Sequence, residues 1–79
     1  MRIEVRLFSY LCKWCGKEGN RHSFVFEIER DATCADLLSA LKIPQEIPKI
    51  ILINETVKEE TYPLEEGDVV SILPPIDGG

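Results

Sequence analysis

The sequence predicts an α+β domain: a mixed sheet of four or five strands with one main helix packed on one face. The chain has 79 residues, which is enough for one domain with a small core. Several segments of strand length are apolar at every second position or throughout, and one segment has apolar residues at helical spacing. The resulting order, β-β-α-β-(β)-β, leaves one helix to cover the sheet, which defines the α+β class.

The first two strands are predicted at residues 2–8 and 22–29, where apolar and polar residues alternate. Their apolar residues are Ile3, Val5 and Leu7 in the first strand and Phe24, Phe26 and Ile28 in the second. Between them, residues 9–16 predict a short helical turn, which Ser9 can cap and Gly16 can end. The short connection predicts an antiparallel hairpin.

The main helix is predicted to begin at Thr33. Thr33 and Asp36 have the spacing of a capping box. One apolar stripe follows, formed by Cys34, Leu37, Leu38 and Leu41. Because the residue before a proline disfavours helix, we expect the helix to stop at Ile43-Pro44.

Three further segments complete the predicted sheet. Residues 49–54 are apolar on both faces, as in an interior strand, and residues 56–58 can return as a short strand. Residues 69–73 form the last strand, after a tight turn at residues 66–68. We expect this last strand to pair with the first one, which places both termini in the middle of the sheet.

Charge and hydropathy exclude several classes of protein. Nine lysine and arginine residues against fourteen acidic residues give a net charge of −5. Phosphate binding needs clustered positive charge, so no nucleic-acid partner is expected. No apolar run approaches the ~20 residues of a membrane helix, and the alternating charges of residues 2–8 are unlike a signal peptide. We therefore expect a cytoplasmic protein that binds neither nucleic acid nor membranes.

Three cysteines, an odd number, favour free thiols over a disulfide framework. Cys12 and Cys15 have CxxC spacing, which also occurs in redox pairs and in half of a zinc site. Zinc needs about four ligands, and only Cys34 and His22 remain, so no metal site is expected. The favoured interpretation is that Cys15 packs in the core while Cys12 is a partly exposed thiol.

Residues 74–79 form an unusual tail after a body at residues 1–73. Pro74 and Pro75 fix φ and lack N–H donors, so they end the last strand and favour a stiff, extended segment. Gly78 and Gly79 have no side chains, so the end of the tail is thin enough to enter a narrow tunnel in another protein. Leu73, at the base, is expected to join an apolar docking surface.

A terminal carboxylate needs activation before it can transfer its acyl group, because its leaving group would be oxide. Adenylation by ATP supplies a better leaving group. If a persulfide then attacks, the carboxylate becomes a thiocarboxylate, whose sulfur is a soft nucleophile. The alternative interpretation is a frayed, inert tail, since chain ends are often disordered and glycine-rich.

Three stretches carry a resemblance to a known family. They are LFSYLCKWCG at residues 7–16, LINETV at 52–57 with YPLEEGDVVSILPP at 62–75, and LPPIDGG at 73–79. With them, the chain resembles the ubiquitin-like β-grasp sulfur carriers of the MoaD/ThiS family over nearly all of its length. The proline pair is typical of the MoaD type, the small subunit of molybdopterin synthase, rather than of the ThiS type.

The resemblance implies a carrier without catalytic side chains or bound cofactor. Gly79 would be adenylated with ATP by an enzyme similar to ubiquitin-activating enzymes and converted to the thiocarboxylate. The sulfur donor would be a protein such as a cysteine desulfurase or rhodanese. The tail, with Leu73, Pro74, Pro75, Ile76, Asp77 and Gly78 as its partner-binding residues, would then enter the large, catalytic subunit of molybdopterin synthase. There it would donate sulfur to cyclic pyranopterin monophosphate.

One departure from the family leaves other functions open. Carriers of the MoaD type commonly have an Arg-Glu pair in the first helical turn, where this chain has Cys12 and Lys13. The alternatives are sulfur transfer to thiazole, to transfer RNA or in a tungsten-specific pathway. A ubiquitin-like protein modifier and a binding module with an inert tail are two further alternatives.

Overall fold

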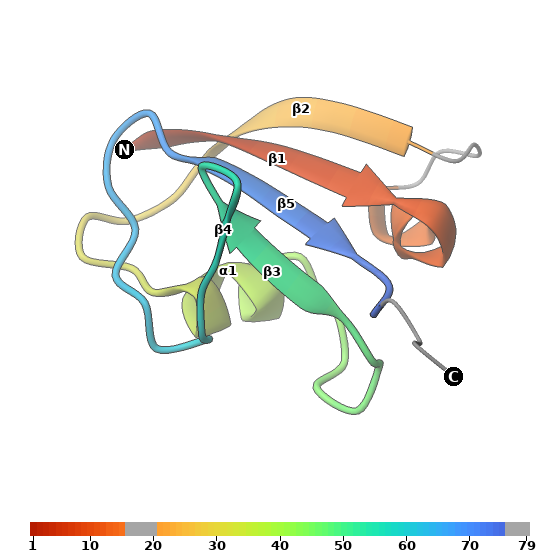
Figure 1. Cartoon of the computed structure of the whole chain (residues 1–79). Coiled ribbons are helices and arrows are strands. Elements are labelled where there is room, and N and C mark those ends of the chain that lie inside the picture. The colour runs from red at the N-terminus through yellow and green to blue at the C-terminus, as the bar shows by residue number, and fades with distance from the viewer. Residues whose placement is uncertain (16–20, 76–79) are drawn as a thin grey trace.

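A five-stranded mixed sheet with a helix on one face forms the body of the molecule (Figure 1). The computed structural model describes residues 1–15 and 21–75. The strands are β1 (Arg2–Phe8), β2 (Arg21–Glu27), β3 (Ile50–Ile53), β4 (Thr56–Val57) and β5 (Val69–Leu73). The helices are the 3-10 helix η1 (Ser9–Cys15) and the α-helix α1 (Cys34–Ala40). The predicted fold class and element order are confirmed.

The order of strands in the sheet is β2-β1-β5-β3-β4, which puts β5 at the centre. β1 and β2 form the predicted antiparallel hairpin. β1 and β5 pair in parallel, with Leu7 opposite Ile72. β3 pairs with β5 in the antiparallel sense, with Ile50 opposite Leu73. The expected pairing of the first and last strands is therefore confirmed, and the last strand leaves the sheet between two neighbours.

The segment after β1 is a 3-10 helix with three residues per turn. Ser9 is its first residue and has a positive φ of 56°. A capping residue normally has an extended backbone, so the predicted cap at Ser9 is wrong. Leu11 and Cys12 are both buried by this turn, and Gly16, its predicted end, lies outside the described residues.

α1 begins as predicted and ends earlier. Both bonds of the Thr33–Asp36 capping box are present. The helix stops at Ala40 because Lys42 takes a left-handed backbone with φ of 63°. The Lys42 N–H then donates to the Ser39 carbonyl and the Ile43 N–H to the Leu38 carbonyl, the two bonds of a Schellman motif. This turn directs Ile43 into the core. Neither helix in the described ranges is long and apolar enough to span a membrane.

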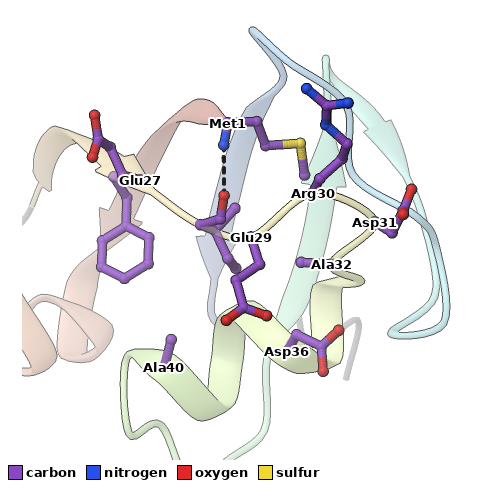
Figure 2. Close-up of a pocket in the computed structure, with 10 residues that line it drawn as sticks. Met1, Glu27, Glu29, Arg30, Asp31, Ala32, Asp36 and Ala40 are labelled. Atoms are coloured by element: carbon purple, nitrogen blue, oxygen red, sulfur yellow. Dashed lines mark hydrogen bonds between the residues drawn. The ribbon is translucent and has the colours of Figure 1, made fainter.

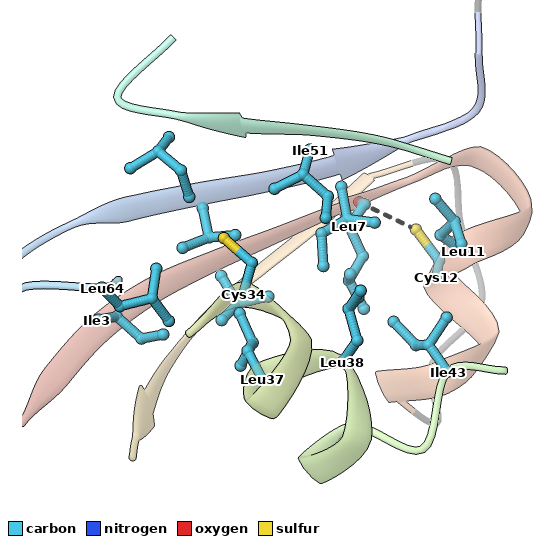
Figure 3. Close-up of a cluster of buried hydrophobic side chains, with 14 residues drawn as sticks. Ile3, Leu7, Leu11, Cys12, Cys34, Leu37, Leu38, Ile43, Ile51 and Leu64 are labelled. Atoms are coloured by element: carbon cyan, nitrogen blue, oxygen red, sulfur yellow. Dashed lines mark hydrogen bonds between the residues drawn. The ribbon is translucent and has the colours of Figure 1, made fainter. Parts of the chain in front are cut away.

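The core lies between the sheet and the two helices (Figure 3). Its buried members come from every second position of β1, β3 and β5, from the inner sides of η1 and α1, and from two loop positions, 43 and 64. They are Ile3, Val5, Leu7, Leu11, Cys12, Cys34, Leu37, Leu38, Ile43, Ile51, Ile53, Leu64, Val70 and Ile72. Trp14 and the apolar residues of β2 are half-buried around this cluster. One sheet face is thus closed, and the opposite face stays open.

One buried carboxylate organises the loops on the side of the N-terminus. Asp68 accepts hydrogen bonds from the Asn54 amide at 3.0 Å and from the Glu65 N–H at 2.8 Å. Asn54 in turn accepts from the Val69 N–H at 3.0 Å. The predicted tight turn is present, with Gly67 at a φ of 84° that favours glycine. The same bonds tie the β3–β4 turn to the start of β5.

Candidate functional site

The tail begins at the carboxyl end of the central strand. Leu73 is the last residue of β5 and lies opposite Ile50 of β3. Pro74 follows in a half-buried position and Pro75 is exposed. Because proline has no N–H to donate, the ladder with the neighbouring strands ends there. The other predicted tail residues, Ile76, Asp77, Gly78 and Gly79, lie outside the described residues.

Two segments flank the base of the tail, and a hydrogen bond joins them. η1 follows β1, and residues 44–49 precede β3, so they adjoin the two strands beside β5. The Tyr10 hydroxyl donates to the Pro48 carbonyl oxygen at 2.6 Å. This bond connects the two neighbours of β5 at its carboxyl end. The two segments that flank the point where the tail leaves the body are therefore fixed relative to each other.

A lysine ammonium holds the second of these segments together. Lys49 Nζ donates to the carbonyl oxygens of Pro44, Gln45 and Ile47, at 3.2, 3.3 and 2.8 Å. The ammonium thus satisfies three carbonyls of a tight loop that contains two prolines. The loop beside the tail is shaped by its own sequence and positions Pro48 for the bond from Tyr10.

Apolar side chains gather on the open face of the sheet near the tail. We call this set the docking face: Phe8, Ile50, Leu52, Val57 and Leu73. The pairings Leu52–Val57 and Ile50–Leu73 put these residues side by side, and the register of β1 with β5 brings Phe8 next to Leu73. Val57 is 67% exposed, while the others are half-buried. Exposed apolar groups in contact with one another are typical of a surface that another protein covers.

Charged residues border the docking face on the side of β1 and β2. The Arg6 guanidinium pairs with the Glu4 carboxylate, and Arg2 pairs with Glu27 at 3.6 Å. The Arg21 guanidinium lies 5.9 Å from the centre of the Phe8 ring. The open face therefore has an apolar half near the tail and a charged half toward the N-terminus.

Of these residues, the sequence predicts only Leu73 as part of a docking surface. It predicts Ile50 and Leu52 as members of an interior strand that is apolar on both faces. The structure shows that no described layer covers the second face. The sequence did contain a signal for this surface. Apolar residues on both faces of β3 indicate that a second layer, besides the helix, covers the sheet.

The cysteines do not form a reactive site among the described residues. Cys12 is 2% exposed and its thiol donates to the Leu7 carbonyl at 3.2 Å, so the prediction of a partly exposed Cys12 thiol is wrong. The 3-10 geometry turns this side chain inward, and the side chain of Cys15 lies outside the described residues. Burial, with the Asp68 and Glu60 carboxylates, raises the pKa of the Cys34 thiol to about 11.

The other chemically active groups are also dispersed. His22 is a half-buried residue of β2 opposite Leu7. Within residues 1–15 and 21–75, no three histidine, cysteine or acidic side chains are grouped to hold a metal ion. The described part of the molecule thus offers a docking face and the base of a tail.

A sequence profile of the ThiS family matches residues 15–79, most of the chain. The chain belongs to the ThiS family. No curated protein sequence matches it significantly.

Solved structures agree with this membership in the ThiS family. SAMP1 from Haloferax volcanii is 22% identical with a TM-score of 0.76, and each chain is covered over 100% of its length. A Pyrococcus furiosus protein, provisionally assigned as molybdopterin converting factor subunit 1, is 20% identical with a TM-score of 0.76. That match covers 96% of this chain and 99% of the other.

A third structure is a complex of subunits 1 and 2 of the molybdopterin-converting factor from Helicobacter pylori. It is 27% identical with a TM-score of 0.65, and each chain is covered over 100% of its length. The likenesses confirm the ubiquitin-like β-grasp fold that the sequence predicted. This fold is shared by sulfur carriers and ubiquitin-like modifiers.

Proposed function

We propose that this ThiS-family chain is a sulfur carrier for molybdopterin synthesis and acts as the small subunit of a molybdopterin synthase. The observation that carries the proposal is the position of the Pro-Pro tail. It leaves the central strand between two segments that a hydrogen bond joins, and beside an apolar docking face. A partner that covers this face would receive the tail in a defined direction. The proposal requires that Gly79 carries the free carboxylate.

The chemistry assigned to this chain is confined to that carboxylate. An activating enzyme similar to ubiquitin-activating enzymes transfers AMP from ATP to Gly79 and releases pyrophosphate. A persulfide on a sulfur donor, such as a cysteine desulfurase or a rhodanese, displaces AMP. A thiol then attacks the donor's sulfur in this acyl disulfide, forms a disulfide with it, and leaves the other sulfur on Gly79 as a thiocarboxylate. The carrier supplies the acyl group, and the side chains that catalyse each step belong to its partners.

The large, catalytic subunit is the proposed occupant of the docking face. The 27% identical relative from Helicobacter pylori was solved as a complex of subunits 1 and 2, which supports a partner of this kind. The tail residues Pro74 to Gly78 would lie in the tunnel of that subunit, and Leu73 would contact its mouth. Glycine at the last two positions leaves room for a nucleophile to approach the carbonyl carbon.

We also propose that the protein works in the cytoplasm. The three cysteines are an odd number, which favours thiols over a disulfide framework, and the Cys34 thiol is free and buried in the core. Such thiols are typical of a reducing compartment.

Reconstitution tests the proposal. The full chain is incubated with ATP, the activating enzyme and the sulfur donor of the same organism, and then with the large subunit and cyclic pyranopterin monophosphate. We expect a thiocarboxylate at the tail and, after the second step, molybdopterin. A thiocarboxylate that supplies only thiazole or transfer RNA would assign a different acceptor. Conjugates on lysines without a thiocarboxylate would indicate a protein modifier, and an unmodified tail would indicate a binding module.

A further inference from the structure

An open groove lies at the opposite end of the molecule from the tail. Its volume is about 630 Å³, and it runs between the end of β2, the segment after it and α1 (Figure 2). Phe26 and Ile28 form its apolar wall on the sheet side, and Ala40 of α1 contributes only a methyl group. Because Phe26 and Ile28 are half-buried, the groove exposes apolar surface that the core does not use.

Carboxylates dominate the rim of this groove. Four acidic side chains line it, Glu27, Glu29, Asp31 and Asp36, against the Arg30 guanidinium and the N-terminal ammonium. In Figure 2, the Glu29 carboxylate points down toward α1, where Asp36 lies. The Asp36 carboxylate is held in place by the Thr33 N–H at 2.8 Å. A cationic side chain has an apolar wall for its methylene stem here and carboxylates for its charged end.

The strand beside the groove also has an unpaired edge. β2 is the first strand of the sheet and pairs only with β1 among the described elements. The Ile28 N–H donates to the Met1 carbonyl at 2.9 Å, and the Met1 ammonium donates back to the Ile28 carbonyl at 2.7 Å. In an antiparallel pair such two-way bonds recur at every second residue. The N–H and C=O groups of Ser23, Val25 and Glu27 therefore point away from β1.

We propose that this groove binds an extended segment of a partner protein in which apolar residues and lysine or arginine residues alternate along one face of the strand, as in a repeat of two apolar residues and two cationic ones. The segment adds to the outer edge of β2 through the backbone groups of Ser23, Val25 and Glu27. Its apolar side chains cover Phe26 and Ile28, and its cations meet Glu29 and Asp36. Only every second side chain of an added strand faces the groove, so apolar and cationic side chains must both occur within that set.

The groove and the tail can be occupied at the same time. β5 runs away from the N-terminus, so its carboxyl end lies on the other side of the body from Met1 (Figure 1). A protein bound along β2 therefore leaves the docking face accessible. The proposal is independent of the sulfur chemistry, because none of the groove residues belongs to the tail or to the docking face.

The test uses the full chain and a synthetic peptide that repeats Val-Val-Lys-Lys as the probe, so that each face of the extended peptide carries both valine and lysine. Amide shifts in NMR spectra are followed during titration, with a peptide that repeats Val-Val-Glu-Glu as the control ligand. We expect changes confined to residues 23–32 and 36–40 and no binding of the acidic peptide. Glu29→Lys should raise the dissociation constant about tenfold or more. The matched control is Glu46→Lys, an exposed charge reversal in the segment between α1 and β3.

Four outcomes would overturn the proposal. They are shifts centred on the docking face, equal weakening by Glu29→Lys and Glu46→Lys, equal binding of the two peptides, and no binding at millimolar concentration. Sedimentation without peptide is measured in parallel. A dimer that Glu29→Lys dissociates would show that a second copy of the chain occupies the groove instead.

Discussion

The two ends of the sheet present different chemistry to a partner. At the carboxyl end of β5, the surface is apolar and a hydrogen bond joins the segments on either side of the base of the tail. At the end near Met1, carboxylates line a groove and Asp68 is buried beneath the loops. Both ends share one core, yet one surface is apolar and the other is acidic. The difference shows how a small body can carry a tail at one end and a chemically distinct surface at the other.

The largest expected effect is the loss of thiocarboxylate formation by a change in the tail that leaves the stability of the body unchanged. Gly79→Ala should nearly abolish thiocarboxylate formation, because a methyl group beside the carbonyl obstructs each attack. The free energy of unfolding should stay within about 0.5 kcal/mol of wild type, as for surface substitutions. Mass spectrometry after reconstitution measures the first quantity and urea unfolding the second. Equal sulfur transfer by the variant would remove the reason for assigning chemistry to the tail.

A change in the shared core should affect both ends together. Leu7 is fully buried between β1 and the helices. Leu7→Ala leaves a cavity and should lower the free energy of unfolding by about 2–5 kcal/mol. Urea unfolding measures this, while NMR reports the docking face and the groove in the same sample. Loss of structure at only one end would show that the two ends do not rely on a common core.

At the acidic end of the molecule, the Cys34 thiol should make the free energy of unfolding depend on pH. The pKa of the Cys34 thiol is raised from 9.0 to about 11 by burial, by Asp68 and by Glu60. Between these values the unfolded thiol ionises while the folded one stays protonated, so stability should fall as pH rises from 9.0 toward 11. The slope from this group is at most about 1.4 kcal/mol per pH unit. Cys34→Ala should remove that part of the slope, and an unchanged slope would contradict the assignment.

The smallest expected effect compares two exposed valines on the same sheet face. Val57 is 67% exposed within the docking face, and Val25 is 64% exposed on β2. Val57→Lys should weaken binding of the large subunit about tenfold, or ~1.4 kcal/mol, whereas Val25→Lys should leave it unchanged. Calorimetry with the large subunit measures both. Similar losses for the two variants would mean that the partner does not distinguish the two halves of the face.

The elements of the fold were predictable because their signals are local. Alternation in residues 2–8, the Thr33–Asp36 capping box and the proline pair each act over a few residues. Element ends were less predictable. The helix ends at Ala40 because Lys42 adopts a left-handed backbone, which is common for glycine and less so for lysine. The inward turn of Cys12 depends on 3-10 geometry that single-residue preferences do not reveal.

The contacts that shape the site join residues far apart in the chain. The bond from Tyr10 to Pro48 spans 38 positions, and the docking face combines residues of four strands. The groove likewise depends on the small size of Ala40 beside Phe26 and Ile28. None of these follows from a sequence pattern, because each requires the strand order first. The chemistry of the tail, in contrast, was predicted from its residues and the family resemblance, and it remains a prediction.

The most direct measurement is the intact mass of the protein purified from its own organism. Fragmentation should locate the replacement of one oxygen by one sulfur at Gly79. That result would establish the thiocarboxylate and leave only the acceptor to be identified. A C-terminal carboxylate that stays unmodified, even after incubation with ATP, the activating enzyme and the sulfur donor, would contradict the role of the chain as a sulfur carrier.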